Sequence, residues 1–143
     1  MNYQSKILRI IDANINRSKE GLRVCEDIMR LIADEKISTL KLKKIRHQVS
    51  TIIKKSQLKE QEIIQNRNSK FDVGKKINIK NSKKTIYNIF FANSQRVKEA
   101  LRVLEEISEI FDKKTSNKFQ NLRFKFYDTE KECFKKIRYL YNS

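Results

Sequence analysis

The chain has 143 residues, which is enough for one compact domain with a buried core and too few for two independent ones. It contains no proline and only two glycines, Gly21 and Gly74, and this composition favours long helices over sheets with tight turns. Its formal net charge of +16 comes mostly from scattered lysines, whereas the arginines concentrate in a few motifs, so we do not expect a nucleic-acid partner.

Apolar residues recur at helical spacing in four segments. The first spans about residues 5–34 with Ser5 as its N-cap, and the second runs from Ser38 to about residue 58. The third helix follows Ser82 and the fourth follows Ser116. Short connections within each pair predict an all-α four-helix bundle of two antiparallel hairpins. We expect one helical domain over residues 1–143, divided into a first half at about 5–58, a loop at about 59–82 and a second half at about 83–141.

The polar stretch between the two halves is long for a loop inside a compact domain. Such loops are usually functional or disordered. Because this one contains Arg67, Asp72 and Gly74, we favour a functional loop.

Membrane and metal-thiolate classes are not indicated. No run of about 18 uncharged apolar residues is present and the N-terminus lacks a signal-peptide core, so we expect a cytoplasmic protein with no membrane partner. Cys25 and Cys133 stand far apart at apolar helical positions, so we interpret both as reduced core residues. His47 is the only histidine, and we interpret it as a structural residue.

One helix motif occurs twice. Residues 13–28 align without gaps on residues 92–107, with Ala, Asn, Arg, Lys, Glu, Leu, Arg, Val, Glu and Ile identical in register. A weaker similarity joins residues 42–47 to residues 119–124, so each half consists of a motif helix followed by a partner helix. This duplication predicts a bundle with pseudo-two-fold symmetry.

The motif places polar side chains on an apolar helix face. Asn14 lies at the centre of that face and Arg17 on its flank, and Asn93 and Arg96 repeat the arrangement in the second copy. A buried amide without a partner would cost about 1–3 kcal/mol, so these groups need partners. The motif glutamates, Glu20 and Glu99, follow each arginine by three residues.

Two interpretations of these six residues remain open. They could form a buried polar network that fixes the register of the bundle. Alternatively, they could line a pocket between the two motif helices that is suited to an anionic ligand and a metal ion. Gly21 indicates a close approach at this point, either by backbone or by a ligand. Further along the motif, Arg23, Arg102, Glu26 and Glu105 are expected on the outer faces as ordinary ion pairs.

Several familiar chemistries lack their motifs. The sequence has no GxxxxGK[ST] or GxGxxG loop and no HExxH, and no Ser or Cys neighbours a histidine base in sequence. A bound nucleotide would therefore be held by side chains and helix N-termini.

Four blocks of the sequence resemble the helical hydroxymethylpyrimidine phosphate kinase family, whose domain occurs alone or fused ahead of thiamine phosphate synthase. Residues 9–23 resemble the opening pattern R-x-L-D-A-N-x-x-R-A-x-E-G-L-R, and residues 93–106 resemble the second block, N-x-x-R-x-x-E-A-L-R-V-L-E-E. Residues 67–74 resemble the central R-D-[TS]-x-G-D-x-G loop, and residues 122–130 the closing R-Y-x-x-Y-x-x-E. The central loop departs from the pattern at Asn68, where an acid is expected, and at Phe71, where glycine is expected.

The resemblance implies a thiamine biosynthesis kinase that uses ATP to convert 4-amino-5-hydroxymethyl-2-methylpyrimidine phosphate to the diphosphate. Phosphoryl transfer between two anions requires charge neutralisation and positioning, usually with Mg²⁺. Our hypothesis is that Arg17 and Arg96 clamp phosphates and that Arg67 closes over the site with its loop. The expected substrate-binding residues are Asn14, Asn93, Glu20, Glu99, Ser69 and Gly74, and the expected ligands of Mg²⁺ are Asp72, Glu20 and Glu99.

Two other functions compete with the kinase. The loop departures favour a non-catalytic module that binds a phosphorylated pyrimidine or partners thiamine phosphate synthase. The second is a basic helical RNA-binding protein, a minor alternative that the net charge allows but for which no recognisable RNA motif is present. The sequence leaves the oligomeric state open, including a homodimer.

Overall fold

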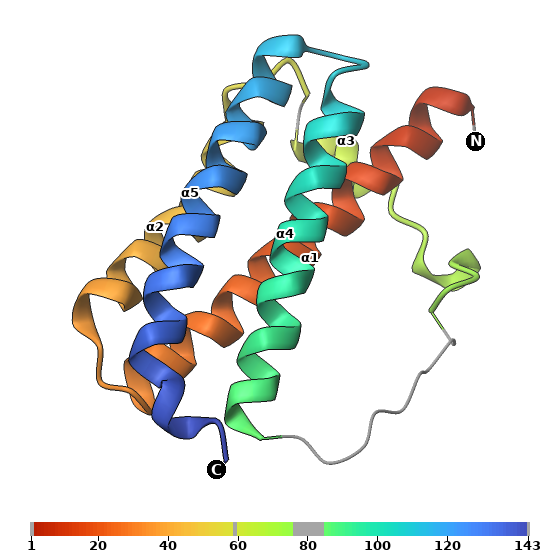
Figure 1. Ribbon diagram of the computed structural model, residues 1–143. Coiled ribbons are helices and arrows are strands. Elements are labelled where there is room, and N and C mark those ends of the chain that lie inside the picture. The colour runs from red at the N-terminus through yellow and green to blue at the C-terminus, as the bar shows by residue number, and fades with distance from the viewer. Residues whose placement is uncertain (1, 59, 76–84, 143) are drawn as a thin grey trace.

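The computed structural model describes residues 2–58, 60–75 and 85–142, and four long helices account for most of them. These are α1 (Tyr3–Leu31), α2 (Lys36–Lys54), α4 (Ile86–Ser108) and α5 (Lys113–Ile137), arranged as Figure 1 shows. The shorter elements are α3 (Glu60–Gln65) and two 3-10 turns, η1 (Ser69–Phe71) and η2 (Arg138–Leu140). The described residues contain no strand, so the predicted all-α class is confirmed.

The four long helices pack in a closed cycle around one core. α1 contacts α2 and α4, and α5 also contacts α2 and α4. Three phenylalanines, Phe90, Phe119 and Phe126, are among the largest fully buried side chains, and the core cluster draws residues from all four helices. The predicted bundle of two hairpins is therefore confirmed. Among the described residues, no helix is long and apolar enough to cross a membrane.

The first two helices begin earlier than the sequence predicts. Asn2, not Ser5, caps α1, because the Asn2 side chain accepts a hydrogen bond from the Ser5 amide at 2.8 Å. α2 begins at Lys36, so Ser38 lies inside the helix, where it is buried. In both cases a serine that looks like a cap in sequence falls inside the first turn.

The second hairpin shows the same effect. Asp112 caps α5 by accepting a hydrogen bond from the Lys114 amide at 3.0 Å. Ser116 instead lies within α5 and donates its hydroxyl to the Glu105 carbonyl at 2.7 Å. Thr85 caps α4, whereas the predicted cap at Ser82 lies outside the described residues.

Gly21 permits a close approach between α1 and α4. A Cβ at Gly21 would lie 2.8 Å from Cγ2 of Val97 and 3.0 Å from the carbonyl oxygen of Asn93. Four residues further along α1, the Cys25 thiol points at the Phe90 carbonyl, 3.9 Å away, so the two helices run antiparallel. Of the two alternatives that the sequence left open for Gly21, contact with a neighbouring helix is the one observed.

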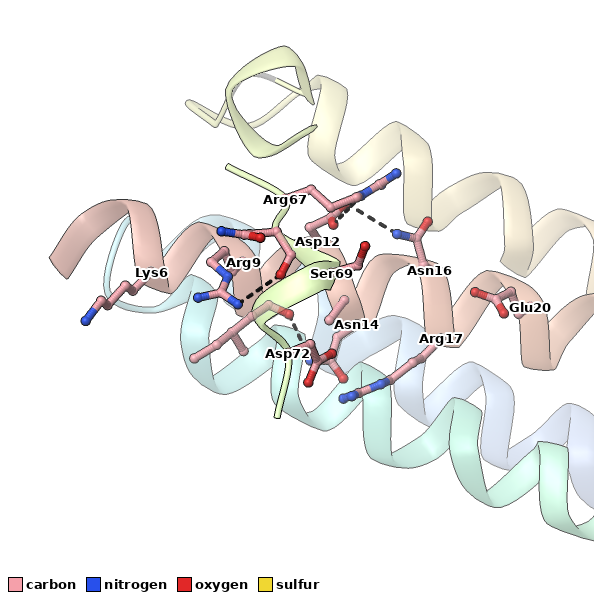
Figure 2. Close-up of a pocket in the computed structure, with 13 residues that line it drawn as sticks. Lys6, Arg9, Asp12, Asn14, Asn16, Arg17, Glu20, Arg67, Ser69 and Asp72 are labelled. Carbon is pink, nitrogen blue, oxygen red and sulfur yellow. Dashed lines mark hydrogen bonds and ion pairs between the residues drawn. The ribbon is translucent and has the colours of Figure 1, made fainter. Parts of the chain in front are cut away.

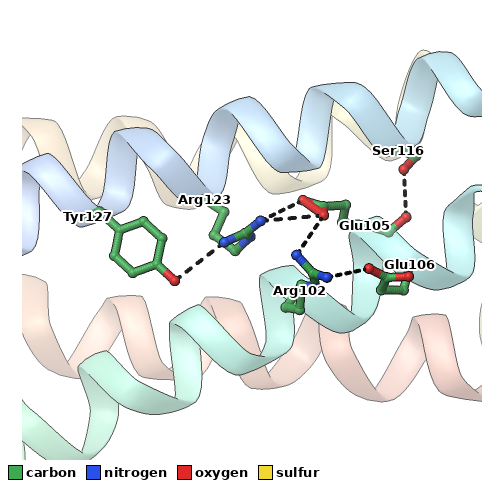
Figure 3. Close-up of polar contacts among 6 residues, drawn as sticks. All are labelled: Arg102, Glu105, Glu106, Ser116, Arg123 and Tyr127. Carbon is green, nitrogen blue, oxygen red and sulfur yellow. Dashed lines mark hydrogen bonds and ion pairs between the residues drawn. The ribbon is translucent and has the colours of Figure 1, made fainter.

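Two matched ion pairs confirm the internal duplication. Arg46 of α2 donates to Glu26 of α1 with Nε 2.9 Å from Oε2. At the equivalent place in the second half, Nη2 of Arg123 lies 3.1 Å from Oε1 of Glu105 (Figure 3). Glu26 and Glu105 are 4% and 7% exposed, so the prediction that they face outward is wrong. The arginine of each partner helix reaches across and covers the motif glutamate.

Residues 60–75 of the predicted loop contain two short helical elements, whereas residues 59 and 76–82 of that loop lie outside the described residues. Within residues 60–75 the chain forms α3, which packs on α1, and then the 3-10 turn η1. Ile63 of α3 is 1% exposed and belongs to the core cluster. This burial holds the start of the segment against the bundle, so the polar residues that follow it lie beside α1.

We predict that neither cysteine reacts with iodoacetamide in the folded protein at pH 8.5. Both thiols are free and fully buried, as the sequence predicts, and burial raises the pKa of Cys133 from 9.0 to about 12. Because the folded-state pKa is raised, the thiol favours folding below pH 9, and this contribution is lost as the pH rises from 9 toward 12. Mass spectrometry should find two labels only after denaturation, and labelling of the native chain would contradict this.

Candidate functional site

One cavity of about 630 Å³ lies on the exposed face of α1 (Figure 2). It is bordered by part of residues 60–75, which we call the central segment. Its charged lining residues are of both signs, with Lys6, Arg9, Arg17 and Arg67 as cations and Asp12, Glu20 and Asp72 as acids. Its other polar lining residues are Asn14, Asn16, Asn68 and Ser69. Ile10, which is 40% exposed, also lines this cavity.

A two-pronged ion pair joins the central segment to α1. Arg67 donates from Nε to Oδ2 of Asp12 at 2.7 Å and from Nη2 to Oδ1 at 2.6 Å. Asn16 adds a third donor to the same carboxylate at 3.3 Å (Figure 2). The hydrogen bond to Asp12 is the main cause of a raised pKa of the Arg67 guanidinium. Asp12 itself is 7% exposed, so α1 holds the carboxylate in place.

Three cations of the cavity have no carboxylate partner among the described residues. Lys6 and Arg17 form no ion pair there, and Arg9 makes only a weak hydrogen bond, 3.4 Å from Nη2 to the Asn68 carbonyl. Arg67, by contrast, is neutralised by Asp12. Lys6, Arg9 and Arg17 can therefore bind an anionic ligand, although the carboxylates of Glu20 and Asp72 in the same lining offset part of their charge.

The motif asparagines are satisfied within their own helices. The side-chain amide of Asn14 donates to the Ile10 carbonyl at 2.8 Å, and Asn93 donates to the Ile89 carbonyl at the same distance. The buried network that would join the two copies through these residues does not form among the described contacts. The helix backbone, rather than a partner across the bundle, supplies the acceptor.

Among the described residues, neither of the two cavities that contain motif residues is lined by side chains of both copies of residues 14, 17 and 20. Arg17, Glu20 and Asn14 line the cavity on α1. Glu99 lines a separate cavity of about 540 Å³ between α4 and α5, and Arg96 lines neither of the two. Asn93 and Gly74 are likewise absent from both linings. The central segment completes a cavity on the first copy, and the pocket shared by the two motif helices stays a prediction.

Two of the three expected ligands of Mg²⁺, Glu20 and Asp72, line the cavity, with Glu20 lying further along α1 than the place where Asp72 borders it (Figure 2). Oδ1 of Asp72 also accepts a hydrogen bond from the Gly74 amide at 2.9 Å. Glu99, the third expected ligand, lines the other cavity. Over the described ranges no group of three or more Asp, Glu, His or Cys side chains could hold a metal. Mg²⁺ commonly uses only one or two protein carboxylates together with substrate phosphates.

Sequence reasoning missed three charged residues of the cavity. Lys6 and Arg9 precede the repeated motif, and Asp12 stands immediately before it. A signal for Asp12 and Arg9 was present, since both belong to the opening block that resembles the kinase family. The repeat gives no signal for Asp12 and Arg9, because the corresponding positions of the second copy hold Phe91 and Asn88.

Comparison with known proteins gives one family. The model of the ThiD2 family matches residues 9–132. A thiamine-phosphate synthase from Prochlorococcus marinus is 35% identical over 132 residues, covering 90% of this chain and 36% of that protein. A thiamine-phosphate synthase from Rhodopirellula baltica is 31% identical over 134 residues, covering 92% of this chain and 35% of that protein. The chain thus spans about a third of the length of these relatives, and no solved structure matches it.

Proposed function

The chain belongs to the ThiD2 family, and we propose that it is a kinase of thiamine biosynthesis. Its substrates would be ATP and 4-amino-5-hydroxymethyl-2-methylpyrimidine phosphate, and its products ADP and the pyrimidine diphosphate. Two relatives are named thiamine-phosphate synthase, which supports the pathway. The resemblance of the four sequence blocks to the hydroxymethylpyrimidine phosphate kinase family supports the reaction.

The observation that carries this proposal is the set of unneutralised cations on one face of α1. Lys6, Arg9 and Arg17 line a cavity of about 630 Å³ without carboxylate partners among the described residues. Two phosphorylated substrates would bring several negative charges to one place. Cations that are already positioned offset their repulsion and need little rearrangement during the reaction.

In the proposed reaction a non-bridging phosphate oxygen of the pyrimidine monophosphate attacks the γ-phosphorus of ATP. A new P–O bond forms, the bond between the γ-phosphorus and the β,γ-bridging oxygen breaks, and ADP leaves with that oxygen. The attacking group is already an anion, so the step needs no strong base from the protein. Arg17 and Arg9 would bind the phosphates, while Asn14 and Ser69 would orient the pyrimidine.

Mg²⁺ would be held in this cavity by Glu20 or Asp72, the two expected ligands that line it. When bound, the ion would neutralise phosphate charge and favour the in-line arrangement. Asp12 is not available for this purpose, because both of its oxygens accept hydrogen bonds from Arg67.

We predict release of ADP that depends on the pyrimidine monophosphate. A coupled assay with ATP, Mg²⁺ and 4-amino-5-hydroxymethyl-2-methylpyrimidine phosphate should show turnover, and the same mixture without the pyrimidine should not. Hydroxymethylpyrimidine without its phosphate serves as the matched control, because it lacks the anion that the cavity cations would bind.

A non-catalytic module that partners thiamine-phosphate synthase is the second candidate. It is favoured by one observation, that the chain covers only about a third of relatives with that name. This candidate predicts binding of the pyrimidine monophosphate with no substrate-dependent ADP. The assay above therefore separates the two functions.

A further inference from the structure

Resting on the proposed kinase function, we propose that Asp12 is a positioning residue for this reaction. It acts through Arg67: the carboxylate fixes the guanidinium, and the guanidinium fixes the central segment along the cavity. Asp12 need not touch either substrate.

In the Asp12–Arg67 ion pair, the carboxylate is buried and the guanidinium is partly exposed to solvent. The Asp12 side chain is 10% exposed and that of Arg67 is 47% exposed. Arg67 uses Nε and Nη2 on the carboxylate, and within the described structure its Nη1 has no hydrogen-bond partner. One edge of the guanidinium is thus bound to α1, and the remaining nitrogen is available to a phosphate.

The ion pair is the main attachment of the segment that follows Arg67. Asn68, Ser69 and Asp72 line the cavity, yet the apolar residues beside them provide no anchor, since Phe71 is 74% and Val73 is 93% exposed. Within residues 68–75, the described hydrogen bond to α1 is the weak one from Arg9 to the Asn68 carbonyl, at 3.4 Å. Loss of the Asp12 carboxylate should therefore release three cavity-lining residues together.

The second motif copy has no carboxylate at the position equivalent to Asp12. The two copies are related by a shift of 79 residues, which places Phe91 where the first copy has Asp12. Phe91 is 49% exposed and offers no acceptor to an arginine. A duplicated bundle thereby acquires one site per chain, on the first copy.

The first test is a double-mutant cycle on kinase activity. Asp12→Asn keeps the shape of the side chain and removes its charge, and Arg67→Gln removes the guanidinium. We expect each variant to raise KM for the pyrimidine monophosphate or lower kcat so that kcat/KM falls about 10- to 100-fold. If Asp12 acts through Arg67, adding Asp12→Asn to the Arg67→Gln variant should not lower kcat/KM any further. Losses that multiply in the double variant would overturn the proposal.

Glu130→Gln is the matched control for a purely structural effect. Glu130 is a carboxylate 12% exposed that binds Lys98 at 3.0 Å in the second half, and it does not line the cavity on α1. A similar loss of kcat/KM in Glu130→Gln would mean that removing any such ion pair impairs the enzyme, and the specific positioning role of Asp12 would be rejected.

The second test does not depend on catalysis. Lys70 and Lys75 are exposed in the segment that Arg67 holds, so trypsin should cut there faster in Asp12→Asn than in the wild type or in Glu130→Gln. Equal cleavage rates would overturn the positioning role of Asp12. If the wild type has no kinase activity but Asp12→Asn is still cleaved faster than the wild type, the proposed function is overturned. The attachment of the central segment through Asp12 then still holds.

Discussion

Arg17→Ala should lower kcat/KM of the kinase reaction by about 100-fold or more while leaving the helical circular dichroism unchanged. Arg17 is exposed, lines the cavity on α1 and has no ion-pair partner among the described residues, so its removal should cost the fold little. The proposed transition state carries charge on the transferring phosphoryl group, and one of its few cationic partners would be lost. Steady-state kinetics with the pyrimidine monophosphate varied at saturating ATP measures this effect.

Arg96→Ala is the natural comparison because Arg96 occupies the equivalent position of the second copy. It is also exposed, but it lies outside the lining of the cavity on α1. We expect Arg17→Ala to cause much the larger loss. Equal losses would instead support the clamp of two arginines from opposite helices that the repeat suggests. Near-normal turnover of Arg17→Ala would remove this residue from the mechanism.

The helical framework could be predicted because it depends on local signals that the sequence repeats. Apolar spacing located all four long helices, and the gapless alignment of the two motif copies predicted their equivalent places in the bundle. The caps were harder to assign, since Asn2 and Asp112 compete with nearby serines for the same few backbone amides. Such a competition is decided by where the chain enters the helix, which the packing of the bundle determines.

The candidate site could be predicted only in part, because its assembly depends on contacts between distant residues. Periodicity places Asn14 and Arg17 correctly on their helix face, and both line the cavity. It cannot reveal that Arg67 reaches back 55 residues to Asp12. The repeat alone does not show which copy binds the central segment: Asp12 of the first copy accepts hydrogen bonds from Arg67, whereas the second copy has Phe91 at the equivalent position.

The largest expected effect on stability comes from the buried ion pair between α4 and α5. Glu105→Gln should lower the free energy of unfolding by about 3 kcal/mol, because it leaves a buried guanidinium without its counter-charge. Arg123 is 8% exposed, and Nη2 contacts both carboxylate oxygens of Glu105, at 3.1 and 3.4 Å (Figure 3). The side chain also lies over the ring of Phe124, with 4.9 Å from Cζ to the ring centroid, so it cannot simply move into water. Urea denaturation followed by circular dichroism at 222 nm measures the change.

Glu106→Gln provides the control at the next position of the same helix. Glu106 is 54% exposed and pairs with Arg102 at 2.8 Å, a shorter distance than in the buried pair. If distance alone set the strength of an ion pair, Glu106→Gln would be the more damaging change. Solvent screens the exposed pair, however, so we expect a loss below about 1 kcal/mol. Equal losses in the two variants would show that burial of Arg123 is not what makes Glu105 important. A large loss confined to Glu105→Gln would identify the covered arginine as the reason the motif keeps a glutamate there.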